Sequence, residues 1–144
     1  MNDVSNKFNT LRYANAEGII ITTKEIIEKI KNKEVPKGDV LEVSRAAGIN
    51  AAKKTSETII FCHPVPIDWA GVSYELLDDK IIVNAEVKAI WKTGVEMEAL
   101  IGVSILLNNI WDMTKYLEKD ETGQYPNTQI TNIRVIKKEK EIIN

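Results

Sequence analysis

The sequence predicts an α+β domain in which one antiparallel sheet packs against helices. Residues 67–76 and 82–91 alternate between two sets of side chains with a period of two, which is typical of paired strands. Residues 93–119 instead carry apolar side chains at helical spacing, which indicates a long amphipathic helix. With the shorter elements, the predicted order is β-α-α-β-β-α-β, a ferredoxin-like order with one additional helix.

Composition indicates one soluble domain. The chain has 144 residues and a net charge of −2, which argues against a nucleic-acid partner because proteins that bind phosphates show a basic excess. The longest apolar run, Ala99–Leu107, is too short to cross a membrane. With a single cysteine and no signal sequence at the start, we expect a cytoplasmic protein. We expect residues 1–10 to be a polar, mobile segment and residues 11–144 to form one domain.

The N-terminal half predicts one strand and two helices. Gly18–Thr23 is a β-branched run that indicates a strand. A short amphipathic helix should follow, ending near Pro36, with an apolar face of Ile26, Ile27 and Ile30. Asp39 can cap a second helix that runs to about Thr58. The small side chains of its apolar face suggest a close approach to another element; they are Leu41, Val43, Ala46, Ala47, Ile49 and Ala51.

The C-terminal half predicts a hairpin, a long helix and a last strand. Leu77–Lys80 should form the hairpin turn, and one face of its second strand carries Val83, Ala85, Val87, Ala89 and Trp91. Thr93–Glu96 has the form of a capping box. The helix should run to about Lys119 and bury Leu100, Val103, Leu107, Ile110, Met113 and Leu117. Ile130–Ile136 is the predicted last strand.

Few side chains could build a metal site or a common nucleotide loop. With one His and one Cys, a single chain cannot supply the three or four nitrogen and sulfur ligands of an ordinary zinc site, so we expect no metal. G-x-G-x-x-G and G-x-x-x-x-G-K-[ST] are both absent. His63 lies between Cys62 and Pro64, and it is either a packed histidine or a site residue.

Glu96 and Glu98 are the second candidate cluster. At helical geometry they point about 200° apart, so both can serve one site only if the first turn is entered from its end. Alternatively, Glu96 completes the capping box and Glu98 is a favourable charge at the helix N-terminus.

Lysines supply the remaining candidates. Asp112 and Lys115 are one turn apart, as in a site or in a simple surface ion pair. Lys37 precedes Gly38 and the start of the second helix, which suits either a phosphate contact or a solvated loop. Positive charge that could extend toward a polyphosphate, or form the solvated face of that helix, comes from Arg45, Lys53 and Lys54.

Short motifs in a specific order make the chain similar to one known family. The most specific are Cys62–Pro64 (CHP) and Thr93–Leu100 (TGVEMEAL). Others are Asp3-Val4-Ser5, Lys37–Val40 (KGDV), Ala46–Ile49 (AAGI), Ala51–Lys53 (AAK), Thr55, and Asp112-Met113 with Lys115. On these motifs, which cover nearly the whole chain, it resembles the MoaC family, the cyclic pyranopterin monophosphate synthases of molybdenum-cofactor biosynthesis.

The resemblance implies a lyase reaction: 3′,8-cyclo-7,8-dihydro-GTP becomes cyclic pyranopterin monophosphate, and pyrophosphate leaves. The implied catalytic residues are Lys37, Asp112 and Lys115. Expected substrate contacts are Phe61, Cys62, His63, Glu96, Met97, Glu98, Lys53 and Lys138. Ring opening and closure need repeated proton transfers, for which a lysine with a lowered pKa is suited. Cationic side chains can also stabilise the charge on the leaving pyrophosphate.

The resemblance also implies a homo-oligomer, a hexamer built as a trimer of dimers, with sites between subunits. Glu98 and Asp112 lie about 21 Å apart along one predicted helix, which independently favours a shared site. We expect a small-molecule substrate and no cofactor, except that Mg²⁺ could accompany the pyrophosphate. No membrane partner is expected.

The chain departs from the family pattern at three places. Lys54 replaces a common arginine, Thr114 replaces a common cysteine, and the end is Lys137–Asn144 where such chains commonly carry Gly-Gly-Lys-Ser-Gly. The alternative function is a non-catalytic module that binds a guanine nucleotide or a pterin on the same scaffold. A subunit with a purely structural role is a third interpretation.

Overall fold

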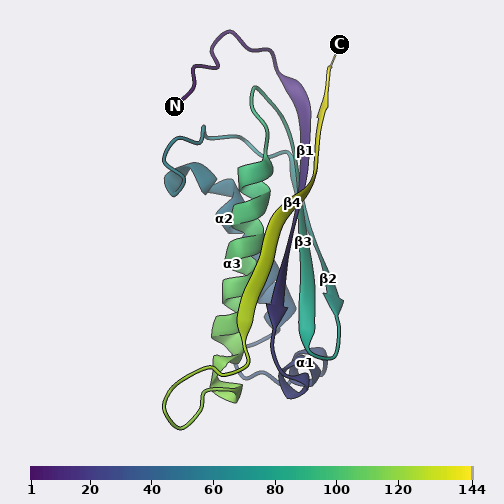
Figure 1. Ribbon diagram of the computed structural model, residues 1–144. Coiled ribbons are helices and arrows are strands. Elements are labelled where there is room, and N and C mark those ends of the chain that lie inside the picture. Colours follow the sequence, from purple (N-terminus) through teal and green to yellow (C-terminus); the bar gives the residue numbers. More distant parts are fainter. Residues whose placement is uncertain (144) are drawn as a thin grey trace.

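The computed structural model describes residues 1–143, which form an α+β fold with one four-stranded antiparallel sheet and three helices (Figure 1). The strands are β1 (Thr10–Ile21), β2 (Trp69–Leu76), β3 (Lys80–Trp91) and β4 (Gln129–Glu141), in the sheet order β2-β3-β1-β4. The helices are α1 (Lys24–Lys31), α2 (Val40–Lys53) and α3 (Glu96–Thr114), with 3₁₀ turns at Thr55–Glu57 (η1) and Lys115–Leu117 (η2). Helix α3 lies along one face of the sheet, and α2 packs beside it (Figure 1).

Strand β1 is twice as long as the strand predicted at Gly18–Thr23. It begins at Thr10 rather than Gly18, and it pairs with β3 over its whole length. The side chains that it turns inward are small or polar in this first half: Thr10, Arg12, Ala14 and Ala16. These side chains give no hydrophobic alternation, so the pattern did not reveal the strand. Arg12 is buried because its guanidinium donates to the Thr10 hydroxyl and to the carbonyl of Lys92.

Strand β4 was also predicted too short. It runs beyond Ile136 to Glu141 and pairs with β1 from Leu11 to Ile21, with two register shifts. Its C-terminal half is an exposed sheet edge made of lysine and glutamate. Such a charged stretch has no hydrophobic pattern, so the sequence did not indicate a strand there. The β3 prediction was confirmed, since Val83, Ala85, Val87 and Ala89 are all buried. Strand β2 begins at Trp69, two residues later than predicted.

The apolar stripe of α3 was predicted well. Val103, Leu107, Ile110 and Met113 are buried, and Leu100 and Leu117 are partly buried against the same core. The α-helix ends at Thr114 and not near Lys119, and a 3₁₀ turn follows. The hydroxyl of Thr114, the residue that replaces a common cysteine, donates to the carbonyl of Ile110 inside this last turn.

Both short helices differ from their predicted bounds. Helix α1 ends at Lys31, where Asn32 caps it and Lys33 takes a positive φ of 55°, so the chain turns before Pro36. Helix α2 ends at Lys53, because the Thr55 hydroxyl bonds the carbonyl of Ala52 and the backbone tightens into η1. Its predicted apolar face was wrong: the buried residues are Val40, Ser44, Gly48 and Ala52.

A close approach between α2 and α3, which the small residues predicted, occurs at two glycines. A Cβ atom built on Gly48 would lie 2.9 Å from the carbonyl oxygen of Gly102 and 3.1 Å from the Cβ of Leu106. The contact is asymmetric, since a Cβ on Gly102 would meet its nearest neighbours at 3.4–3.8 Å, an ordinary packing distance. Helix α2 can therefore lie directly on the backbone of α3 only while position 48 lacks a side chain.

This asymmetry predicts opposite effects for one substitution. Gly48→Ala should lower the free energy of unfolding by about 1–3 kcal/mol, because it forces the two helices apart. Gly102→Ala should be neutral or stabilise by up to about 1 kcal/mol, since alanine favours the helix and has room. Urea unfolding of both variants at one protein concentration measures the difference. Equal losses in the two variants would contradict the packing described.

Candidate active site

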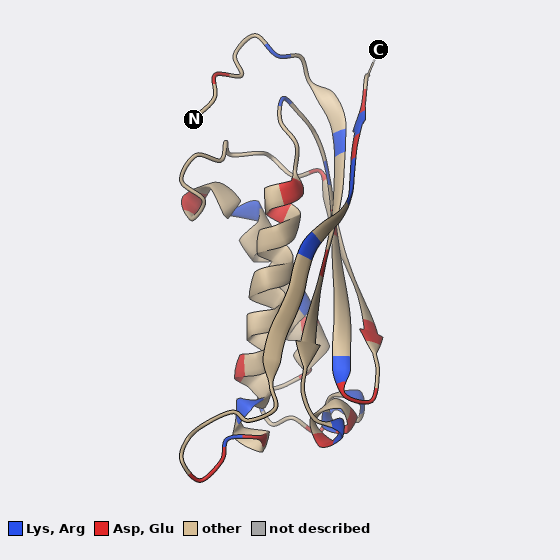
Figure 2. Ribbon diagram, in the orientation of Figure 1, with Lys and Arg blue, Asp and Glu red and all other residues tan. Residues whose placement is uncertain are grey.

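The two ends of α3 carry the two groups of predicted site residues. Glu98 lies in the first turn and Asp112 near the last, about 21 Å apart along the axis. Figure 2 shows acidic residues at both ends of this helix and basic residues beside the lower end. The groups are described in turn below, as an acidic cavity and a basic cluster.

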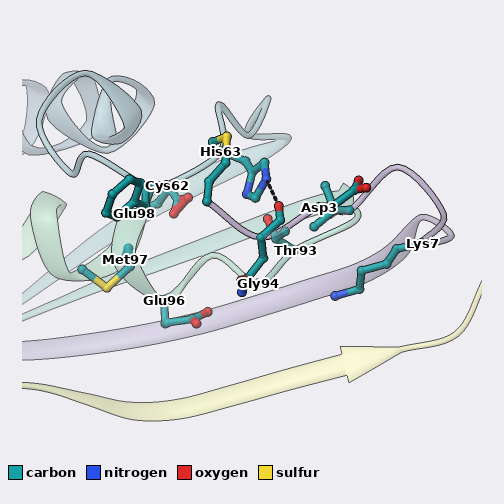
Figure 3. A pocket seen from close by; sticks show the side chains of 13 residues that line it. Asp3, Lys7, Cys62, His63, Thr93, Gly94, Glu96, Met97 and Glu98 are labelled. Atoms are coloured by element: carbon teal, nitrogen blue, oxygen red, sulfur yellow. Dashed lines mark hydrogen bonds between the residues drawn. The ribbon is translucent and has the colours of Figure 1, made fainter.

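The acidic cavity has a volume of about 520 Å³ and opens at the N-terminal end of α3 (Figure 3). The predicted residues Phe61, Cys62 and His63, from the loop after η1, meet Glu96, Met97 and Glu98 of the first helical turn there. Because the cavity is entered from the end of the helix, both glutamates line it despite their divergent directions. The volume is in the range of small-molecule sites.

Glu98 is the most buried charged side chain of the cavity. It is 4% exposed, and its Oε2 atom has no hydrogen-bond partner. The pKa of Glu98 is raised to about 7, mainly by burial; a hydrogen bond from its own backbone N–H lowers it, and the nearby Glu96 contributes a smaller increase. Near neutral pH this carboxyl group can therefore either hold or release a proton.

Glu96 does not complete a capping box, so that prediction was wrong. The N-cap of α3 is Val95, and no side chain caps the helix. The Oε1 atom of Glu96, which lines the cavity, pairs with the Nζ atom of Lys138 of β4 at 3.2 Å, and its Oε2 atom is buried without a partner. Gly94 allows this arrangement, because any Cβ at position 94 would collide with that oxygen. Lys138, a predicted substrate contact, thus lies beside a residue of the cavity wall.

The loop side of the cavity presents three different groups. Phe61 is 72% exposed, so its ring faces solvent with no protein contact to hold it in a core. Burial raises the pKa of the Cys62 thiol, and Glu98 and Glu96 add to the shift, so this thiol is not an activated nucleophile. The Nε2 atom of His63 donates to the backbone carbonyl of Asn2 at 2.8 Å.

The basic cluster forms at the other end of α3. The Nζ atom of Lys115 lies 2.8 Å from Oδ1 of Asp112, and the Nζ atom of Lys37 lies 3.6 Å from Oδ2 and 2.9 Å from the Asp112 carbonyl oxygen. Lys37 reaches α3 from the loop between α1 and α2, where Gly38 has a positive φ of 122°. Asp112 and Lys115 are therefore more than an isolated surface pair, since a third residue joins them.

Electrostatics at this cluster differ from the expectation of a lysine with a lowered pKa. The hydrogen bond and charge of Asp112 raise the pKa of Lys115, and Lys115 with Lys37 lowers the pKa of Asp112. All three side chains are exposed, so they remain charged in the isolated chain. In this state they can hold phosphate oxygens through charge-assisted hydrogen bonds.

Lys53 is the one predicted contact that the structure brings to neither group. It lies exposed in the last turn of α2. Conversely, the site includes residues that sequence reasoning did not assign to it: Met1, Asn2, Asp3, Val4, Lys7, Thr93 and Gly94. The motif matches at residues 3–5 and 93–94 were the available signal, because nothing in their spacing indicates a cavity.

No group of three or more His, Cys, Asp or Glu side chains within residues 1–143 is arranged to hold a metal ion. Over the same residues, none of the helices combines the length and the apolar character that a membrane crossing requires.

Known proteins resemble the chain over nearly its whole length. The MoaC family model matches residues 1–141. A protein of Sulfurisphaera tokodaii named probable cyclic pyranopterin monophosphate synthase is 55% identical over 138 residues, covering 96% of this chain and 91% of the relative. One of the same name from Methanococcoides burtonii is 50% identical over 143 residues, covering 99% and 90%. A relative from Methanothermobacter thermautotrophicus, named a probable accessory protein of that synthase, is 49% identical over 140 residues, covering 97% and 88%.

The family model and these relatives agree with the motifs that first suggested the resemblance. The chain belongs to the MoaC family.

Proposed function

We propose that this protein is a cyclic pyranopterin monophosphate synthase, a lyase of molybdenum-cofactor biosynthesis. It converts 3′,8-cyclo-7,8-dihydro-GTP to cyclic pyranopterin monophosphate and releases pyrophosphate. The observation that carries the proposal is the 55% identity, over 96% of the chain, to a relative of that name. Incubating the protein with this substrate and measuring pyrophosphate tests it. The alternative, a module that binds a guanine nucleotide or pterin without reaction, predicts binding and no pyrophosphate.

The two groups of the site suit different parts of this substrate. The acidic cavity offers carboxyl groups that can meet the N–H groups of a purine or pterin ring, and Phe61 offers an aromatic face for stacking. The basic cluster offers two ammonium groups to the negative triphosphate, whose departure as pyrophosphate needs cations. Lys37, Asp112 and Lys115 are the proposed catalytic residues, with Asp112 orienting both lysines.

One substrate can contact both groups only across two chains. Ile105 lies midway between Glu98 and Asp112 in sequence, and it is 39% exposed. It borders an apolar groove of about 460 Å³ with Ile101 and side chains of α2 and η1. Two α3 helices packed antiparallel about Ile105 would cover this groove and bring Glu98 of one copy close to Asp112 of the other, twice per dimer. We further propose that three such dimers assemble into a hexamer.

Three further assignments belong to the same proposal. The strand order β2-β3-β1-β4 supports a ferredoxin-like classification. Mg²⁺ could accompany the pyrophosphate, and no resident metal or cofactor is proposed. The cytoplasm, where GTP derivatives are made, is the proposed location.

The first prediction concerns the basic cluster. Lys37→Ala and Lys115→Ala should each fold normally, because both side chains are exposed, and should lose nearly all activity. Circular dichroism and a product assay measure the two effects. Lys119→Ala is the matched control, since Lys119 is an exposed lysine just beyond the cluster. A Lys115→Ala enzyme within about tenfold of wild type, ~1.4 kcal/mol of barrier, would refute the assignment.

The second prediction concerns metals. Activity should survive dialysis against a strong chelator, because Cys62 and His63 are too few to hold a transition metal. The measurement is pyrophosphate release without added divalent ions. If activity disappears and only zinc or iron restores it, His63 binds a metal ion and the prediction that it contacts the substrate is wrong. Restoration by Mg²⁺ would be compatible with a role at the pyrophosphate.

The third prediction concerns the shared site. Glu98→Ala and Lys115→Ala chains, each inactive, should regain activity when mixed after mild dissociation. In a mixed dimer one site carries both substitutions and the other carries none, so complete exchange should restore about a quarter of wild-type activity. Native mass spectrometry verifies the exchange. If mixed dimers form and remain inactive, the site lies within one chain.

A further inference from the structure

The first seven residues cross the acidic cavity (Figure 3). Of the residues that line this cavity, Met1, Asn2, Asp3, Val4 and Lys7 come from the segment that precedes β1. The same cavity is lined by Cys62 and His63 of the loop after η1 and by Gly94 and Glu96 at the start of α3. It is therefore part of the cavity wall, although it contains no helix or strand.

This segment is held weakly. Two hydrogen bonds fold it on itself, from the Ser5 amide to Oδ1 of Asp3 at 2.9 Å and from the Lys7 amide to the Val4 carbonyl at 3.0 Å. Within residues 1–143, the only hydrogen bond from residues 1–9 to the rest of the chain is the one between Asn2 and His63. Nearly all of its side chains are exposed, so little apolar burial supports it.

The segment encloses space instead of filling it. A volume of about 520 Å³ remains beneath it, lined in part by Glu96 and Glu98. The Oε2 atom of each of these glutamates is buried without a hydrogen-bond partner. A buried carboxylate oxygen without a hydrogen bond is costly, and a ligand with N–H groups would remove that cost. The arrangement is that of a cover above a preformed site.

We infer that residues 1–7 form a strap that opens to admit the substrate and closes over it, with the Asn2–His63 hydrogen bond as its latch. The inference rests on the proposed function, since the substrate is the cyclised GTP derivative. His63 then has two tasks, because its Nε2 atom holds the strap while the rest of the ring faces the cavity. Closure excludes water from the Glu96 and Glu98 carboxyl groups and strengthens their contacts with the ligand.

Trypsin cleavage after Lys7 measures strap opening. When reclosing is faster than cleavage, the rate follows the open population. In the inactive Lys115→Ala protein, saturating 3′,8-cyclo-7,8-dihydro-GTP should slow cleavage after Lys7 by about fivefold or more and leave cleavage after Lys119 unchanged. Lys119 is an exposed internal control beyond the other end of α3. An unchanged rate at Lys7, with calorimetry showing that the ligand is bound, would overturn the inference.

The latch is tested without any ligand. His63→Phe removes one hydrogen bond, so cleavage after Lys7 should become about two- to tenfold faster in the free protein. Equal rates would show that His63 does not hold the strap. Because this arm needs neither substrate nor turnover, its outcome is independent of whether the protein proves to be a synthase.

A matched pair of aspartates tests the role of the strap in binding. Asp3 and Asp120 are both exposed, and each accepts backbone N–H bonds within a local turn, but only Asp3 lies in the strap. Asp3→Ala should weaken calorimetric binding of the substrate by about threefold or more, while Asp120→Ala leaves it unchanged. Equal affinities would count against the strap. Binding without pyrophosphate release by the wild type would refute only the proposed function.

Discussion

Helix α3 is the rigid element that fixes the geometry of the whole site. Its buried stripe packs on β1, β3 and β4, and Gly48 lets α2 lie directly on its backbone at Gly102. Neither end can shift toward the other, so the distance between Glu98 and Asp112 is set by helical geometry alone. A single chain therefore presents two separated half-sites. This fixed distance is the basis of the proposal that two chains share each site.

The two half-sites differ in how their charges are satisfied. Lys37, Asp112 and Lys115 satisfy one another in solvent, and such exposed pairs are easily exchanged for phosphate oxygens. Glu96 and Glu98 instead retain buried oxygens with no partner. The charges of the first group are therefore paired within the chain, whereas two oxygens of the second group are not.

How far the sequence predicts this structure depends on how each element is buried. β3 and α3 have one apolar face, so their periodicities predicted them. The first half of β1 buries Ala14, Ala16 and Arg12, and β4 ends in an exposed lysine–glutamate edge, so neither has a hydrophobic pattern. The site residues came from motifs, because spacing alone left each one with an equally good structural explanation. What no pattern could give was the position of residues 1–7, which depends on one hydrogen bond.

The missing cap of α3 shows how local stability and function are connected. Thr93 and Glu96 have the spacing of a capping box. An N-cap side chain of this kind stabilises a helix by about 0.5–2 kcal/mol. The chain instead caps with Val95, and the bend at Gly94 turns Glu96 into the cavity beside Lys138. In a formed box the Glu96 carboxylate would accept a hydrogen bond from the backbone N–H of Thr93. Glu96 remains free to line the cavity because that local bond is absent, so the arrangement of the acidic cavity depends on a helix without a side-chain cap.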